Sequence, residues 1–173
     1  MLGRRRREIP LWVDVVFGAA AGALGTSWMT PARNAIARFQ SEEDQRREVE
    51  SSYSDKSPAR AAKKLTEPLG IELEDPKRAG HVISWTYGTL WGVAYALLSR
   101  GRGSLPLAGG LALGTALWAV GDEVFVPALR LAPGPTKFPL STHAKAWGCH
   151  LAYGSGADLG LRTLRAAWRA LVH

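Results

Sequence analysis

The chain has 173 residues, of which 46% are hydrophobic, and its 22 Lys and Arg outnumber its 15 Asp and Glu. This apolar content excludes a disordered chain, and a lone cysteine, Cys149, excludes a disulfide framework. The charges are unevenly distributed, because residues 34–79 hold nine Lys and Arg and ten Asp and Glu, whereas the remaining residues hold thirteen and only five. Most of the chain is therefore almost without acidic side chains.

The first predicted element is a membrane-spanning helix at residues 11–32, after a basic N-terminus at 1–10. Residues 15–32 are uncharged over 18 positions, and a helix needs about 20 mostly apolar residues to cross a bilayer. Trp12 and Trp28 bracket this span as interfacial anchors would, although tryptophans packed against another helix fit equally. A cleavable signal peptide is the alternative, but the apolar run continues to residue 32, which favours a retained anchor.

A polar segment at residues 33–78 follows the first span and is predicted to be helical. Its bases alternate with acids instead of forming a stripe, so no nucleic-acid partner is predicted. The segment fits either a solvated cap or a docking surface for a partner. Capping residues followed by proline predict three helix starts, at Thr30 with Pro31, Ser57 with Pro58, and Asp75 with Pro76.

Three more spans are predicted in the second half of the chain, at residues 79–99, 103–130 and 141–162. The first is uncharged over 21 positions, whereas the second contains acids and the third contains Lys145 and Asp158. A soluble helical protein is the alternative, but its core helices would carry a polar face at helical spacing. The predicted fold is therefore an all-α integral membrane bundle of four transmembrane helices, with a helical polar loop between the first and second.

The distribution of Lys and Arg near the span ends predicts that both termini are cytoplasmic. Bases gather in the N-terminus, at Arg100 and Arg102, and from Arg162 into the basic tail at 163–173, whereas the short outer connection between the third and fourth spans, with its loop at 131–140, has only Arg130 and Lys137. This orientation places the 33–78 segment on the periplasmic side. Asp14 and Asp158 lie near the cytoplasmic ends, where pairing with arginines is expected.

Each predicted span carries two glycines at a spacing of four, a pattern that lets helix backbones approach closely in lipid. These helix-packing residues are expected to hold the bundle together or, less simply, to form a face for oligomers. They are Gly18 with Gly22, Gly88 with Gly92, Gly110 with Gly114, and Gly156 with Gly160.

Ionisable residues inside the spans form the candidate site, because burying them in lipid is costly without partners. Glu123 lies about 10 Å inside the outer end of the third span, and His150 lies about 13 Å inside the fourth. His143 precedes His150 by two helical turns, so both line one face. Pro127 lacks an N–H and leaves a backbone carbonyl free in the preceding turn. The predicted cluster comprises Asp122, Glu123, His143 and His150, with His81 at its entrance and Lys145 as a further partner.

Several chemistries fit this cluster. Its residues suit proton or cation transfer, divalent-metal ligation, or axial ligation of a haem or pigment by His150 or His143. The structural alternative is a buried network in which Asp122 or Glu123 pairs with Lys145 or a histidine and joins the last two spans. A phosphate-binding loop, a His-Glu-x-x-His motif and a Gly-x-Ser-x-Gly elbow are all missing from the sequence, so no enzymatic activity is predicted.

The second half of the chain resembles the YagU-like family of bacterial inner-membrane proteins. The likeness covers residues 79–165 and rests on Gly80-His81 at the second span, the polar turn before Pro127, the loop at 131–135, and the His143-to-His150 segment. The resemblance implies a bacterial inner-membrane protein with about four helices and implies no reaction or substrate.

Two functions therefore remain open. The first is a non-catalytic accessory subunit that packs against other membrane chains or against a second copy of itself within lipid. The second is proton or cation handling through the acid and histidine cluster. Four spans are few for a transport pathway in one chain, which favours the accessory subunit.

Overall fold

The computed structural model describes residues 9–101 and 107–172, and this part of the chain is all-α, without strands. The basic residues at 4–7 and the first residues of the predicted third span lie outside the described residues. Seven α-helices are named, in chain order α1 (Leu11–Ala37), α2 (Glu42–Ser51), α3 (Ser57–Thr66), α4 (Pro76–Leu98), α5 (Ala108–Ala116), α6 (Val126–Ala128) and α7 (Leu140–Val172). The shorter elements are the 3₁₀ turns η1 (Glu67–Leu69) and η3 (Pro135–Lys137) and the π-helix η2 (Leu117–Phe125).

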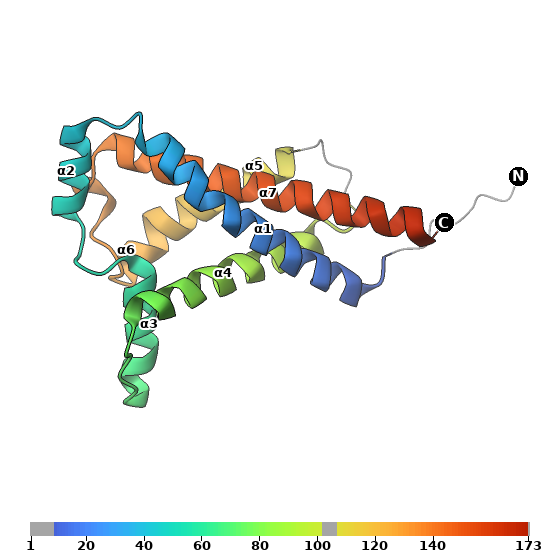
Figure 1. Cartoon of the computed structure of the whole chain (residues 1–173), viewed down its shortest axis with the longest axis horizontal. Helices are drawn as coiled ribbons and strands as arrows, with labels where there is room; N and C mark the ends of the chain where they lie inside the picture. Colours follow the sequence, from blue (N-terminus) through green and yellow to red (C-terminus); the bar gives the residue numbers. More distant parts are fainter. Residues whose placement is uncertain (1–8, 102–106, 173) are drawn as a thin grey trace, which may run out of the picture.

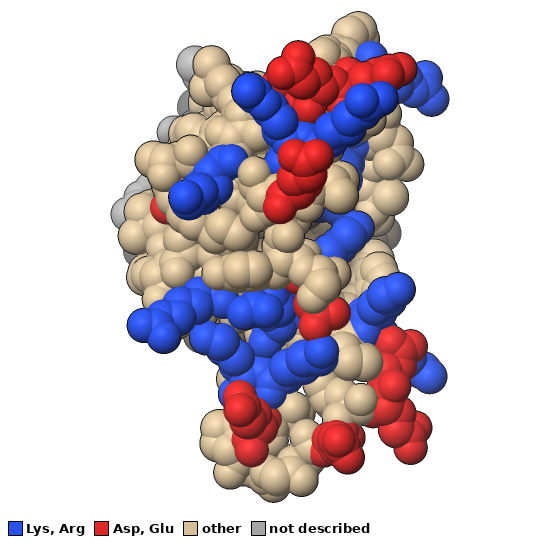
Figure 2. Space-filling view, turned by 90° about the vertical axis from the view of Figure 1, so that its left-hand side faces the viewer, with Lys and Arg blue, Asp and Glu red and all other residues tan. Residues whose placement is uncertain are grey.

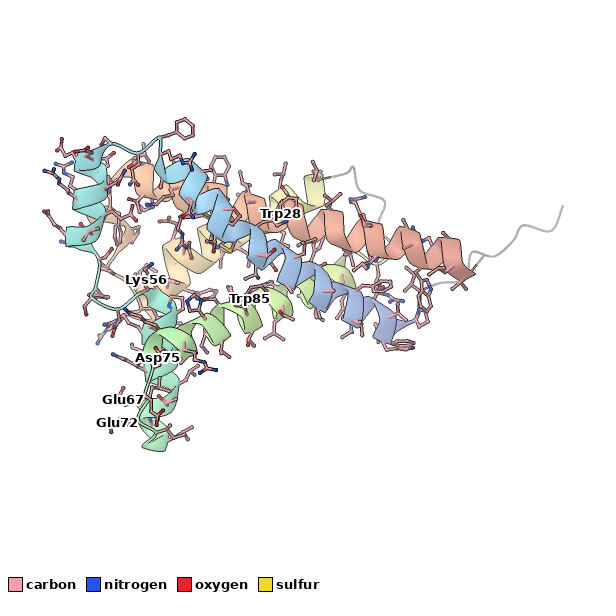
Figure 3. All side chains as sticks on the ribbon, viewed as in Figure 1. Trp28, Lys56, Glu67, Glu72, Asp75 and Trp85 are labelled. Atoms are coloured by element: carbon pink, nitrogen blue, oxygen red, sulfur yellow. The ribbon has the colours of Figure 1, made fainter. Side chains whose placement is uncertain are left out.

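The long helices run side by side along the longest axis of the molecule (Figure 1). They are α1, α4, α7 and a composite helix made of α5, η2 and α6 in succession. The composite helix is the third long helix in chain order, and we call it the third helix. Helices α2 and α3 lie across one end, which we call the cap end. The start of α1 and the finish of α7 lie at the other end, the terminal end (Figure 1). Figure 3 shows Lys56, Glu67, Glu72 and Asp75 at the cap end and Trp28 and Trp85 farther along the long helices.

The predicted glycine pairs lie where the helix backbones meet. A Cβ added to Gly92 of α4 would collide with the backbone of Gly22 in α1, and one added to Gly18 would lie 2.7 Å from the Cα of Val93. Helix α1 therefore packs on α4 through backbone surfaces with no room for a side chain. A Cβ at Gly156 of α7 would lie 3.2 Å from the Cα of Gly25 in α1.

The third helix packs on α7 in the same way. Added Cβ atoms at Gly110 and Gly114 would collide with the carbonyls of Gly154 and His150, respectively. Gly154 is a contact that the spacing of glycines in the sequence did not single out. Gly160 fits beneath Leu24 of α1, whose Cδ2 would lie 2.9 Å from an added Cβ. All four pairs thus pack within one chain, and the faces they form are occupied in the monomer.

Two helices are long and apolar enough to cross a membrane, namely α1 and the third helix at Ala108–Ala128. Helices α4 and α7 have the length but are not among them. Their glycines, tyrosines and tryptophans are uncharged but have low hydropathy. The absence of charge therefore overestimated how apolar α4 is. The all-α fold is confirmed, while the crossing of the bilayer by all four long helices remains a proposal.

The helix boundaries differ from the sequence prediction in two places. Thr30 and Pro31 do not start a helix, because α1 continues through them to Ala37. Packing of the residues after Pro31 stabilises the helix despite the proline. Ile36 packs on Gly148 of α7, where an added Cβ would lie 2.5 Å from the Ile36 Cδ1. At the other end, α7 runs unbroken to Val172, so residues 163–172 of the predicted tail continue the helix.

Two of the three predicted helix starts are present, those of α3 and α4, and the polar segment also forms α2, whose start was not predicted. Helix α2 is capped by Ser41, which accepts a hydrogen bond from the backbone N–H of Asp44. Helix α3 begins at Ser57 with proline in its first turn, but Ser57 does not cap it, because the cap position belongs to Lys56. Asp75 caps α4 as predicted and accepts hydrogen bonds from the N–H groups of Lys77 and Arg78, each at 3.0 Å.

Candidate functional site

The two acids of the predicted cluster lie in the π-helix η2. The N–H of Val126 bonds to the carbonyl of Gly121, five residues earlier, whereas the N–H of Leu129 bonds to Phe125, four residues earlier. The register therefore changes around Pro127, which has no N–H to donate. π-Helical turns inside α-helices are rare and occur frequently at functional sites. Here the wider turn presents the consecutive residues Asp122 and Glu123 to α7 together.

Two acid–histidine pairs join the third helix to α7. The Nδ1 atom of His143 lies 2.7 Å from a carboxylate oxygen of Glu123, and the Nδ1 atom of His150 lies 3.6 Å from one of Asp122. The histidines are seven residues apart, so the two pairs form successive rungs along one face of α7. We call these four residues the cap-end cluster. Their pairing matches the structural alternative in which the acids bind histidines across the last two long helices.

Each histidine has a second contact, to a backbone carbonyl. The Nε2 atom of His143 lies 3.0 Å from the carbonyl of Pro135, so both of its ring nitrogens are engaged. The Nδ1 atom of His150 also lies 3.0 Å from the carbonyl of Ala146, one turn earlier in α7. These contacts fix the orientation of both rings.

The sequence predicts Lys145 as a further partner of the acids of η2, but Lys145 does not pair with them. Its ammonium lies 2.5 Å from a carboxylate oxygen of Glu48 in α2 and 2.9 Å from the side-chain oxygen of Gln40. Thr142 and Gln40 also donate to Glu48, at 2.8 and 2.9 Å. Burial raises the pKa of Glu48, but the hydrogen bonds from Lys145, Gln40 and Thr142 outweigh it, so the pKa lies below its usual value. This group fastens α2 to the start of α7.

His81 does not join the cluster either. Its side chain is exposed on α4, and among the described residues no hydrogen bond or ion pair links it to the other five predicted site residues. Within the same part of the chain, no group of three or more His, Cys, Asp or Glu has a geometry that could hold a metal ion. The sequence placed His81 correctly near one end of α4, but the face of the helix on which it lies was not predictable from depth alone.

A second polar group, which we call the terminal-end network, is built around Asp14 and Asp158. Both carboxylates are buried, with 2% of each residue exposed. Asp14 of α1 binds Arg100 at 2.5 Å and Arg165 of α7 at 3.0 Å. Arg165 also donates to the carbonyl of Ala96 in α4 at 2.7 Å. One aspartate thus links three of the four long helices.

Asp158 is equally well supplied with donors. It accepts hydrogen bonds from the Tyr95 hydroxyl at 2.5 Å, the backbone N–H of Leu107 at 2.9 Å and the Arg162 guanidinium at 2.8 Å. Buried charges are tolerated when they are paired and fully hydrogen-bonded, as here. The predicted arginine pairing of both aspartates is present, but it takes place inside the bundle instead of in water.

An apolar layer separates the two polar groups. Asp158 follows His150 by eight residues, about 12 Å along α7. Between them Leu117, Tyr153 and Ala157 form a buried cluster, against which Met29 and Leu113 pack. The one hydroxyl in this cluster, that of Tyr153, donates to the carbonyl of Gly88 at 2.6 Å. The polar groups at the two ends are therefore not joined by a file of polar side chains within this layer.

Sequence reasoning missed several of the residues that complete these groups. Glu48 was hidden among the other acids of the polar segment, and only its position opposite Lys145 in the fold distinguishes it. Tyr95 is one of six hydroxyl side chains in the uncharged run at residues 79–99, and no pattern in the sequence distinguishes it from the others. Arg165 was recognised only as part of the basic tail.

No family model, curated protein or solved structure matches the chain. The resemblance to the YagU-like family, which rests on motifs in residues 79–165, stays a prediction.

Proposed function

We propose that the protein is an integral membrane protein of the bacterial inner membrane and an accessory subunit that packs against other membrane chains or a second copy. All four long helices cross the bilayer in this proposal, with the terminal end in the cytoplasm. Its support is that α4 and α7, which are less apolar, share backbone-level contacts with α1, one of the two helices apolar enough to cross. A helix packed this closely against a span must share its depth.

The observation that carries the accessory role is the apolar layer between the two polar groups. A transport pathway needs polar groups or water along its length, whereas Leu117, Ala157 and Met29 fill the middle of this bundle. The buried carboxylates at the terminal end have arginine partners, so their charges serve cohesion. Large apolar side chains remain uncovered on the third helix, among them Val120, Val124 and Phe125. This face is available to lipid or to another membrane chain.

Photocrosslinking in cells tests the accessory role. A photoreactive phenylalanine analogue replaces Val124 or Phe125, and the matched control carries it at Leu161, which is buried against Ala21 and Ala96. We expect one discrete adduct from the exposed positions, at the mass of a specific partner or at twice the mass of the chain, and none from Leu161. If neither exposed position gives a protein adduct in intact membranes, the accessory role is wrong.

Proton or cation handling at the cap-end cluster is the second candidate. The specific observation in its favour is the π-helix that presents two adjacent acids to two histidines, because such turns frequently mark functional sites. His143 lies two turns nearer the start of α7 than His150, so a proton or cation from the cap end reaches the pair of Glu123 with His143 first. Asp122 and His150 would then form the inner rung.

Flux into reconstituted vesicles separates the two candidates. Glu123→Gln and His150→Ala should abolish proton or cation flux if the cluster conducts, whereas Glu50→Gln, an exposed acid on α2, should leave the flux unchanged. Absence of flux in the unmodified protein, or equal flux in all three variants, would rule out transport through the cluster.

The haem or pigment hypothesis has a simpler test. Both ring nitrogens of His143 are occupied by Glu123 and Pro135, so His143 would have to give up a hydrogen bond to ligate iron. His150 uses only Nδ1 for the contacts described above and keeps Nε2 as the better candidate ligand. A visible absorption spectrum of protein purified from its native membrane decides, since bound haem or pigment absorbs strongly there.

A further inference from the structure

Residues 57–75 form an arm that lies across the long helices. Helix α3 crosses the first turns of α4, and a Cβ added to Gly80 would lie 2.7 Å from the backbone nitrogen of Ala59. Figure 1 shows α3 running at a steep angle to α4 and extending past it, away from the rest of the bundle. If the long helices cross a bilayer, the arm lies along its surface. The inference below thus rests on the proposed membrane topology.

Two hydrogen bonds fix the depth of the arm. The Lys64 ammonium donates to the carbonyl of Leu129 at 2.7 Å, and the Arg60 guanidinium donates to the carbonyl of Arg130 at 3.2 Å. These carbonyls lie at the end of the third helix, where backbone acceptors lack partners within the helix. The arm is therefore held level with the end of the third helix and the start of α4, the height at which headgroups meet hydrocarbon.

The arm carries apolar side chains that no part of the described chain covers. Ala62 is buried against α4, and Leu65 and Leu69 follow it at spacings of three and four, so they continue the same stripe beyond the edge of the bundle. Leu65 is 62% exposed, Leu69 70% and Ile71 53%. On α4, Val82 and Trp85 are exposed within the first three turns of the helix, the same part of α4 on which α3 packs through Gly80.

Charge does not explain the arm. Bases and acids nearly balance in residues 57–78, with five Lys and Arg against four Asp and Glu. Figure 2 views the cap end and shows basic side chains gathered across its middle, with acidic side chains toward the lower tip. Several of these bases are already engaged, because Lys63 binds Asp55 at 2.6 Å and Lys64 binds the third helix. The apolar stripe of the arm is thus the feature that has no partner among the described residues.

We propose that α3 and η1 are an in-plane membrane anchor, with Leu65, Leu69 and Ile71 inserted into the boundary between the headgroups and acyl chains of the leaflet on the cap side. Amphipathic helices of this kind bury their apolar side chains about 5–10 Å into that boundary. The anchor sets the depth of α4, to whose first turns α3 is packed. It supplies apolar contact with the bilayer where α4, which is less apolar than α1, needs it.

Spin labels on single cysteines test this anchor in phosphatidylcholine vesicles. The labelled variants are Leu69→Cys and Leu65→Cys on the stripe, with Glu72→Cys, an exposed acid of the arm outside the stripe, as the matched control. A label at Leu90→Cys, exposed in the middle of α4, reports separately whether the helix crosses the membrane. Native Cys149 is buried, with 3% exposed, and its labelling is measured on the unmodified chain.

We expect the labels at 65 and 69 to collide severalfold more with oxygen, which partitions into lipid, than with a water-soluble nickel complex. The label at 72 should show the reverse. Because the proposed contact is hydrophobic, adding anionic lipid should leave these ratios unchanged. Water-like labels at 65 and 69 beside a lipid-like label at 90 would overturn the anchor alone, as would labels shielded from both reagents, which would indicate a protein cover. A water-like label at 90 would instead overturn the membrane topology.

Discussion

The two ends of the bundle hold charged side chains in different ways. At the terminal end, Asp14 and Asp158 are fully buried and receive their donors from arginines, a tyrosine and the backbone. At the cap end, Glu123 and His143 are partly exposed, and the carboxylate of Asp122 lies 3.6 Å from its histidine. The first arrangement is shut off from solvent and supplies each buried carboxylate with several donors. The second is partly open to solvent and supplies fewer contacts to each carboxylate, so the strongest cohesion is expected at the terminal end.

Removing a terminal-end charge should have the largest effect. Asp14→Asn leaves Arg100 and Arg165 facing a neutral amide, and breaking a buried ion pair by removing one partner costs roughly 3–5 kcal/mol. Unfolding of the detergent-solubilised protein against denaturant measures the loss, with Glu50→Gln as the control for removal of an exposed acid. A loss below about 1 kcal/mol, the usual range for surface ion pairs, would mean that the network is solvated.

Filling the close contact between α1 and α4 should have the next largest effect. Gly22→Ala adds a methyl group where the carbonyl of Gly88 already lies, and overpacking of this kind typically costs about 1–3 kcal/mol. Gly134→Ala is the matched control, because nothing lies within 4 Å of the position of its added Cβ. The same unfolding assay applies. Equal stability of the two variants would contradict the backbone-level contact.

The junction between α2 and α7 should depend on pH. The pKa of Glu48 is lower in the folded protein than its ordinary value of 4.5, so the ionised carboxylate stabilises the docked state above pH 4.5. This contribution falls as the pH drops below 4.5 and is lost once Glu48 is protonated in the folded state. The protection of α2 against hydrogen exchange, measured relative to the intrinsic exchange rate at each pH, should therefore fall on acidification.

The control for this prediction is Glu48→Gln, which lacks the titrating carboxylate. Its α2 should have low protection at neutral pH as well, and this protection should change less between pH 7 and the acid range. If the protection of α2 in the unmodified protein is the same at neutral and acid pH, the pair of Glu48 with Lys145 does not hold it.

The smallest effect on stability is expected at the cap-end cluster. Glu123→Gln replaces a partly exposed carboxylate with an amide that still accepts from His143, and a hydrogen bond of this kind contributes about 0.5–1.5 kcal/mol. Unfolding measured beside Asp14→Asn tests the contrast directly. A loss as large as that of Asp14→Asn would make the cap-end cluster a second clamp.

Much of this architecture could be predicted from the sequence because it follows from local patterns. Uncharged runs located the long helices, Asp75 before Pro76 located the start of α4, and glycines spaced by four located backbone contacts. Depth along each helix also predicted that the acids of the third helix lie level with the histidines of α7. Each of these inferences needs only the rise and period of a helix.

The features that sequence reasoning missed depend on tertiary structure. The partner of Lys145 is set by how the polar segment folds back, and no periodicity encodes that path. The π-helix could not be anticipated from Pro127, because a missing N–H is compatible with a kink, a break or a change of register. Pro31 was mistaken for a helix start because the contact of Ile36 with Gly148 lies more than a hundred residues away in the chain.

The order in which the chain is synthesised gives Asp14 a further significance. Arg100 follows it by 86 residues and Arg165 by 151, so α1 emerges from the ribosome long before either counter-charge exists. The buried carboxylate of the first helix therefore receives its full set of partners only after the last helix has been made and has packed against it. A chain that ends before α7 would lack one of the two arginines that pair with Asp14.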